Sequence, residues 1–134
     1  MSITHLVLFQ FKADVSTNVI SDVSLENPVQ YAHHHHFELT RSFSNQACTR
    51  MLALKDNCVH PTSQKPYIQA ASGGQDNSPE GIQNGITHAF VVHFATAEDR
   101  DYYVKQDPAH QAFIKSLDGI IEKAQVIDFT DRVY

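Results

Sequence analysis

Two histidines and a tyrosine lie within the stretch from Thr87 to Phe113. His88 begins an alternating apolar segment, Tyr103 follows in a helical pattern, and His110 ends the motif Asp-Pro-Ala-His. Imidazole titrates near neutral pH and is the commonest general base in proteins, and a phenol can donate a hydrogen bond to a developing oxyanion. These residue types predict acid–base chemistry that requires no metal and no cofactor.

Local start signals place His110 in the first turn of a helix. Asp107 is a good capping residue, and Pro108 is favoured at the first helical position. The positive end of the helix dipole disfavours a charged imidazole there, whereas the Asp107 carboxylate favours it, so the direction of the net pKa shift stays open. A purely structural alternative is that His110 bonds to the Asp107 cap.

A second set of signals predicts the preceding helix. Thr96 is a suitable N-cap with Asp99 three residues later, so a helix should run through Asp101, Tyr102 and Tyr103. Because the two tyrosines are adjacent on this helix, at most one of them can face a cavity.

Period-2 alternation predicts strands that each place one histidine among apolar side chains. In the first strand, from Ile3 to Lys12, one face carries His5, Val7, Phe9 and Phe11. In the second, the same kind of face carries His88, Phe90, Val92 and Phe94, with His93 pointing the other way. His5 and His88 are therefore expected to be core histidines or to line a cavity.

The remaining elements complete a recognisable order. Helical patterns cover Val15–Val23, with Ser16 as its cap, and about Ala47–Asp56; strands are predicted near Tyr67–Ala71 and at Glu122–Thr130, and Ser72–Gly85 should be an exposed loop. The order strand, helix, strand, strand, helix, strand predicts a ferredoxin-like α+β fold, with helices on one face of a four-stranded antiparallel sheet.

The opposite face of that sheet is predicted to be apolar and must be buried against another surface. It would carry Leu6, Leu8, Val91 and Ile127, which is apolar enough to predict pairing with a second copy. We therefore expect a homodimer in which two sheets form one dimeric α/β barrel.

The segment from Ser24 to Gln46 fits neither of its flanks. It contains Pro28 and four successive histidines at 33–36, and its removal would join STNVISDV to ACTRMLALKDN in one helix. We interpret 24–46 as an insertion into the first helix. One hypothesis is a retained intron, because Val23-Ser24 can be encoded by a splice-donor sequence and Asn45-Gln46 can end in CAG. A polyhistidine tract can bind transition metals, but without further ligands at defined spacing we predict no metal site.

Composition limits the class of protein. The 134 residues suffice for a single domain, 1–134, and the net charge of -5 argues against a nucleic-acid partner. The chain contains no long apolar span, so no membrane partner is expected. Cys48 and Cys58 are too few for a disulfide framework, and we expect reduced thiols and a cytoplasmic protein.

Four segments together resemble the stress-responsive A/B barrel (Dabb) family. They are ITHLVLFQFK, GITHAFVVHF, DPAHQAF and VIDFT. The fungal branch of this family, for which no activity is established, has segments that are similar to LALKDNCVHPTSQKPYI and GGQDNSPEG. The resemblance implies a homodimer with a small apolar cavity lined by His and Tyr.

The resemblance also implies candidate site residues. The best understood enzyme of the family is olivetolic acid cyclase, a polyketide cyclase, in which a histidine of the Pro-Ala-His motif and an upstream tyrosine promote an aldol condensation. By motif these correspond to His110 and Tyr103 as catalytic residues, with His5 and His88 as substrate-binding residues. This chain has one residue more between tyrosine and motif, so Tyr102 is a rival to Tyr103, and it has Asp107 where the family usually has His.

Two functions follow from the resemblance. One is a non-catalytic, stress-associated homodimer, and the other is a cofactor-independent cyclase or lyase acting on a small carbonyl metabolite.

Overall fold

The computed structural model describes residues 1–14 and 33–134 of the chain, with side chains described from Thr40 onward in the second range. The helix predicted at Val15–Val23 lies outside the described residues. The elements are β1 (Ile3–Phe11), α2 (His33–Asn57), β2 (Ile68–Gln75), β3 (His88–Phe94), α3 (Ala97–Lys105), α4 (Pro108–Ser116) and β4 (Ile121–Phe129).

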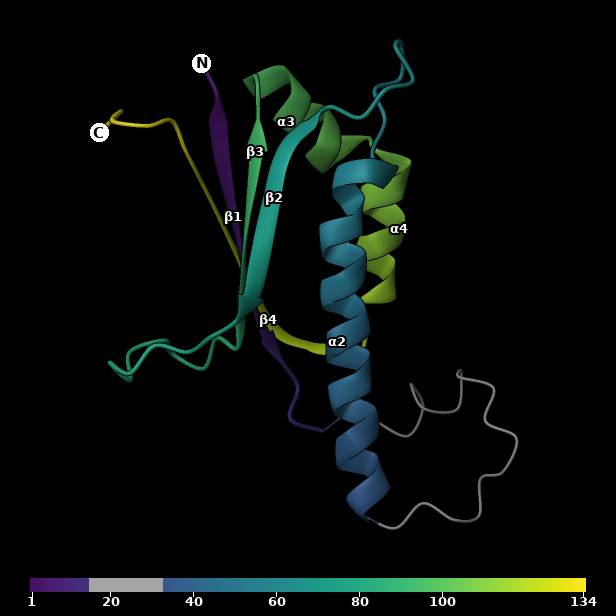
Figure 1. Cartoon of the computed structure of the whole chain (residues 1–134), viewed down its shortest axis with the longest axis vertical. Coiled ribbons are helices and arrows are strands. Elements are labelled where there is room, and N and C mark those ends of the chain that lie inside the picture. The colour runs from purple at the N-terminus through teal and green to yellow at the C-terminus, as the bar shows by residue number, and fades with distance from the viewer. Residues whose placement is uncertain (15–32) are drawn as a thin grey trace.

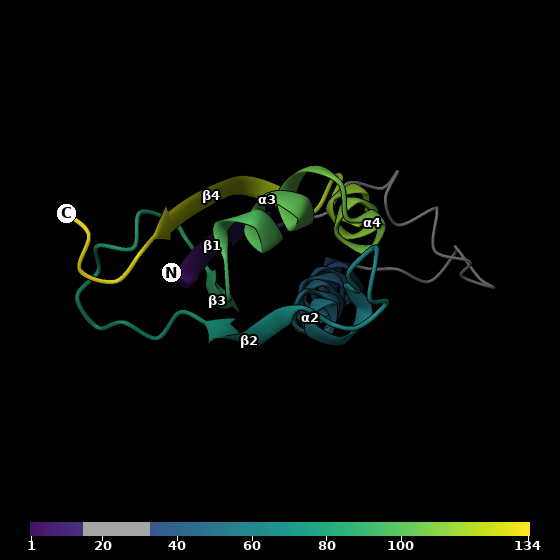
Figure 2. The same cartoon turned by 90° about the horizontal axis from the view of Figure 1, so that it is seen from above.

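The strands form one antiparallel sheet in the order β2-β3-β1-β4. Helices α2 and α4 pack on one face, and α3 crosses near one end of the sheet (Figures 1 and 2). The loop after β2 and the C-terminal segment extend toward the opposite side (Figure 2). This arrangement confirms the predicted ferredoxin-like α+β fold.

Strand β1 has the alternation that its sequence predicts. Its odd-numbered residues are buried beneath the helices, and its even-numbered residues are only half-buried on the other face. Directly opposite residues on neighbouring antiparallel strands lie on one face, so His5 shares its face with Val92 of β3 and Asp128 of β4. The hydrophobic core lies between this face and the helices.

Strand β2 is longer than predicted, because Ser72–Gln75 continue it instead of starting a loop. Gly73 explains the difference. A side chain there would place its Cβ 2.3 Å from Cδ1 of Phe90 on β3, so the bare glycine leaves room for this buried ring to lie against the strand.

Helix α2 begins at His33, well before the start predicted at about Ala47. Residues 33–46 of the segment interpreted as an insertion are therefore helical. The residues of α2 that face the core recur every three or four positions, as a helix packed on a sheet requires: Thr40, Phe43, Ala47, Met51 and Leu54. The isolated Phe43 was too weak a signal to extend the sequence prediction.

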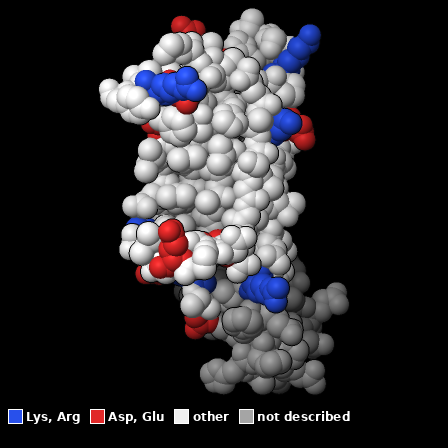
Figure 3. Space-filling model, turned by 60° about the vertical axis from the view of Figure 1, so that its left-hand side comes forward, with Lys and Arg blue, Asp and Glu red and all other residues white. Residues whose placement is uncertain are grey.

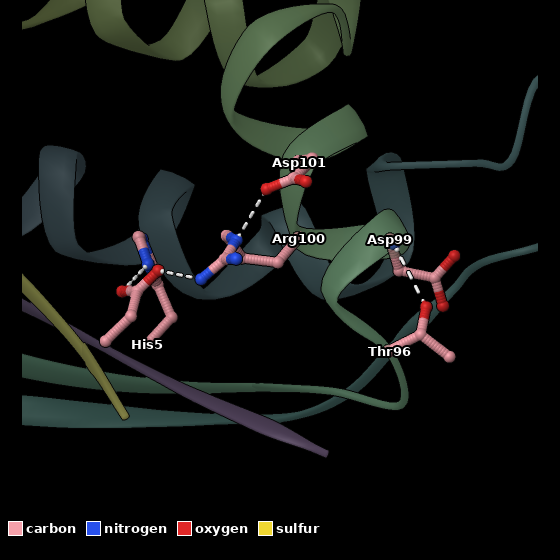
Figure 4. Close-up of polar contacts among 6 residues, drawn as sticks. His5, Thr96, Asp99, Arg100 and Asp101 are labelled. Carbon is pink, nitrogen blue, oxygen red and sulfur yellow. Dashed lines mark hydrogen bonds and ion pairs between the residues drawn. The ribbon is translucent and has the colours of Figure 1, made fainter. Parts of the chain in front are cut away.

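Caps define the two short helices as predicted. Thr96 Oγ1 accepts a hydrogen bond of 3.1 Å from the backbone N–H of Asp99 at the start of α3 (Figure 4). Asp107 caps α4 through its side chain, and Pro108 is the first helical residue.

The outer face of the sheet is poor in charge. Across its middle the molecule shows no Lys, Arg, Asp or Glu, and the charged side chains gather toward the two ends (Figure 3). Ile127 and Phe129 of β4 are 55% and 44% exposed on this face. Its apolar character agrees with the prediction that it pairs with another surface.

Within the described ranges, none of the helices is both long and apolar enough to cross a bilayer.

Candidate functional site

The structure brings His5, Tyr103 and His110 together, although they belong to β1, α3 and α4. The rings of Tyr103 and His110 are stacked, with centroids 3.9 Å apart and planes inclined by 26°. His5 meets the Tyr103 ring edge-on at 5.7 Å. Three of the four predicted site residues thus form one cluster beneath α3.

A carboxylate on β4 anchors His5. Nδ1 of His5 lies 2.5 Å from Oδ1 of Asp128, and Arg100 on α3 donates to the other oxygen of this carboxylate at 2.8 Å. Arg100 also donates to Asp101 at 2.8 Å, and Figure 4 shows it reaching from α3 toward His5. His5 is only 3% exposed, so the bonded carboxylate fixes its orientation in a region with little water. The sequence patterns missed this pair, because it depends on the register between β1 and β4.

Burial favours the neutral form of both members of the stacked pair. Desolvation lowers the pKa of His110 below its usual range and outweighs a contact with the Tyr103 backbone that raises it. Desolvation likewise raises the pKa of Tyr103, helped by Cys58 and Asp107. The net shift of the His110 pKa is therefore downward, which favours the uncharged imidazole.

Two polar atoms of this pair are left without partners. Tyr103 Oη and His110 Nδ1 are both buried, and neither has a hydrogen-bond partner among the described residues. His110 does not use its ring nitrogen to bond to the Asp107 cap; instead its backbone N–H donates to that carboxylate at 3.4 Å. The pair thus leaves one hydroxyl and one imidazole nitrogen without a hydrogen bond.

The structure separates the two rival tyrosines. Tyr103 is 0% exposed and contacts both site histidines. Tyr102 is only half-buried, and its ring contacts lie with His60 and Tyr67, on a different side of α3. Tyr103 is the residue that belongs to the cluster.

His88 stands apart from the other predicted residues. It pairs with Phe9, four residues along β1 from His5, which at about 3.3 Å per residue is roughly 13 Å away. Its ring contacts Phe11 at 4.8 Å and lines a cavity of 770 Å³ between the end of the sheet and α2. Burial lowers the pKa of His88. His93 is on the outer face, as predicted, and lies 3.3 Å from Thr4.

A second polar cluster, also missed by the sequence patterns, lies at the start of α4. Tyr67 Oη donates to Oδ2 of Asp107 at 2.5 Å. Cys58 is completely buried beside them, and burial together with the Asp107 carboxylate raises the pKa of its thiol to about 12. Both cysteines are free thiols, as predicted.

The described residues contain no group of three or more His, Cys, Asp or Glu side chains arranged to hold a metal ion. The imidazoles of residues 33–36 lie outside the described side chains.

Comparison with protein families identifies the chain. The model of the stress-responsive A/B barrel domain, Dabb, matches residues 3–131. The chain belongs to this family. No match was found among curated proteins.

Solved structures of similar fold cover nearly the whole chain. A crystal structure of an Arabidopsis thaliana protein has a TM-score of 0.64 at 23% identity, covering 98% of this chain and 97% of that one. A hydroxynitrile lyase from Passiflora edulis has a TM-score of 0.65 at 17% identity, covering 99% and 96%. A dimeric ferredoxin-like protein of unknown function from Bacteroides fragilis has a TM-score of 0.57 at 18% identity, covering 96% and 94%. At these identities the likeness concerns the fold of this Dabb protein.

Proposed function

We propose that this Dabb protein is a cofactor-independent acid–base enzyme acting on a small, uncharged carbonyl compound, with His110 as general base and Tyr103 as hydrogen-bond donor. The observation that carries the proposal is the pair of buried, unpartnered atoms, Tyr103 Oη and His110 Nδ1. A buried polar group without a partner costs about 1–3 kcal/mol, so proteins leave few of them. A bound carbonyl substrate would supply both missing partners.

The chemistry follows from the protonation states. Neutral His110 removes a proton from the carbon next to a carbonyl, and the electron pair moves to the carbonyl oxygen, which accepts a hydrogen bond from Tyr103. The carbanion equivalent then attacks a second carbonyl and forms a carbon–carbon bond. The protonated imidazole returns its proton to the resulting alkoxide, so the base is regenerated. The reverse sequence is a lyase reaction.

His5 supports this site from behind the phenol. Because Asp128 and Arg100 hold the imidazole in place, its edge keeps the Tyr103 ring in one position. The His88 cavity, at the other end of the same sheet face, is the proposed space for the remote part of a substrate.

Family likeness supports the reaction class without assigning a substrate. One structural neighbour is a hydroxynitrile lyase, so the fold is compatible with catalysis. The motif resemblance to olivetolic acid cyclase suggests linear poly-β-ketones as first substrates, and the similarity to fungal sequences suggests a fungal metabolite.

The test is turnover of linear poly-β-ketones by wild type, His110→Ala and Tyr103→Phe. Loss of a general base is expected to reduce the rate by about 10²–10⁴-fold. Tyr102→Phe is the matched control, because the ring of Tyr102 contacts His60 and Tyr67 and lies outside the cluster. Equal rates in wild type and His110→Ala would dismiss His110 as the base.

A homodimer is the proposed assembly. The charge-poor outer face, with Ile127 and Phe129 exposed, supports it, and the Bacteroides fragilis neighbour is dimeric. Ile127→Glu should dissociate the dimer in sedimentation experiments, whereas Ile114→Glu, at a 46% exposed position on α4, should not. A wild-type monomer would refute this assembly.

The second candidate function is a non-catalytic, stress-associated homodimer. Close packing favours it, since His5 and Tyr103 are 3% and 0% exposed. In that case His110→Ala leaves dimerisation intact and no carbonyl substrate is turned over. The two free thiols are compatible with a reducing compartment, so the cytoplasm is the proposed location.

A further inference from the structure

We propose that Tyr67 and Asp107 form a positioning pair that holds His110 against Tyr103. The proposal rests on the acid–base function proposed above and adds to it two residues that lie outside the reacting pair.

The junction between α3 and α4 bonds Asp107 to the helix that carries Tyr103. The backbone N–H groups of Gln106 and Asp107 both donate to the carbonyl oxygen of Tyr102, at 2.9 and 3.0 Å. The bond from Asp107 spans five residues, one more than a helical bond, and so accommodates an additional residue between the tyrosine and the Pro-Ala-His motif. Asp107 is thereby fixed to the turn that carries Tyr103.

The side chain of Asp107 makes the second connection. Its Oδ1 accepts hydrogen bonds from the backbone N–H groups of Ala109, at 2.9 Å, and His110, at 3.4 Å. One residue is therefore bonded on one side to the helix of Tyr103 and on the other to the backbone of His110. The 3.9 Å stack of the two rings depends on this link.

Tyr67 fixes the carboxylate itself. Asp107 is 1% exposed, and a buried carboxylate is stable only when several donors replace its hydration. Tyr67 Oη donates to Oδ2 of Asp107 at 2.5 Å, so Oδ1 of Asp107 can accept from the backbone N–H groups of α4. The ring of Tyr67 also stacks on Phe94, which packs against the ring of Tyr103 at 5.1 Å. Tyr67 thus contacts the supports of both reacting groups.

A stack this close has a spectroscopic signature that needs no substrate. The Tyr103 ring current shifts the imidazole protons of His110 upfield, and the spectrum of His110→Ala assigns them. Tyr67→Phe removes only the hydroxyl, and Asp107→Ser keeps a short cap that does not reach Tyr67. We expect each variant to lose most of the upfield shift, and the double variant to lose no more than either alone.

Tyr102→Phe is the matched control. Its ring also contacts Tyr67, at 5.7 Å, but no side-chain hydrogen bond joins it to Asp107, so the His110 resonances should stay in place. Asp107→Asn retains a capping oxygen and a polar group for Tyr67, and should restore most of the shift relative to Asp107→Ser. If Asp107→Ser fails to fold, Tyr67→Phe alone decides the question.

The competing reading is that the pair only stabilises α4. Reduced melting temperatures with unchanged His110 resonances would establish that reading and overturn the positioning role. The readout is independent of turnover. If the stack depends on the pair while His110→Ala retains full activity, the positioning pair stands and the proposed enzyme function fails.

Discussion

Deleting residues 24–46 tests how the chain builds the first helix. The deletion would place Thr17 at the position that Thr40 occupies in α2, and Ile20 at the position of Phe43. Among the side chains of α2 that the structure describes, these are the two core-facing positions that the deletion changes, and each receives a residue of suitable character. Ala13 lines the same cavity as Thr40, so the short connection from β1 is within reach.

The expected cost is small. Thr17 replaces a threonine, and Ile20 replaces a half-buried phenylalanine, which together should change the free energy of unfolding by about 1 kcal/mol. For a domain of this size that corresponds to roughly 5 °C in melting temperature. We expect the shortened protein to keep its circular dichroism spectrum and its state of assembly.

A deletion of residues 24–44 supplies the matched control. It leaves Asn45 and Gln46 in the chain and puts Asp22 in place of the half-buried Phe43. Loss of the ring and desolvation of a carboxylate should together cost about 2–4 kcal/mol. Thermal melts followed by circular dichroism compare the two deletions. Unfolding of the 24–46 variant, or equal stability of both variants, would contradict the proposed register of Thr17 and Ile20 and with it the interpretation of 24–46 as an insertion.

Three further predictions concern stability and reactivity. Gly73→Ala should lower the free energy of unfolding, measured in urea, by about 1–3 kcal/mol, because the new methyl would lie 2.3 Å from an aromatic carbon. Gly74→Ala has open space around its Cβ and should leave the free energy of unfolding unchanged. Equal effects of the two substitutions would contradict this packing. Burial lowers the pKa of His110 in the folded protein, so the unfolded chain binds more protons below about pH 6.5. The contribution of His110 to the free energy of unfolding should therefore be constant above that pH and fall as the pH approaches the lower folded pKa. His110→Gln should flatten this fall, and an unchanged slope would argue against a buried neutral imidazole. Iodoacetamide should alkylate half-buried Cys48 in the native protein but reach Cys58, whose pKa is about 12, only after unfolding, as mass spectrometry can check.

Local signals in the sequence predict much of the fold. The alternation of β1, the Thr96 cap and the Asp107-Pro108 start each depend on a few neighbouring residues, and each is found where predicted. The start of α2 was missed, because Phe43 is the one large core-facing residue among the side chains described before Ala47, and one residue does not reveal a period.

The site is only partly predictable for a physical reason. His5, Tyr103 and His110 could be named as candidates, but their stacking and the separation of His88 depend on how distant elements pack. The anchoring of His5 by Asp128 joins the first strand to the last. Such bonds have no local pattern, because they arise from sheet register and not from sequence spacing.

Proton exchange shows whether His110 acts as a base toward a carbonyl compound. The measurement is the rate at which a simple uncharged β-diketone exchanges its α-protons in deuterated buffer, followed by NMR with and without the protein. We expect exchange faster than in buffer alone for wild type and Tyr102→Phe, and a return to the buffer rate for His110→Ala. Equal exchange with wild type and His110→Ala would contradict it.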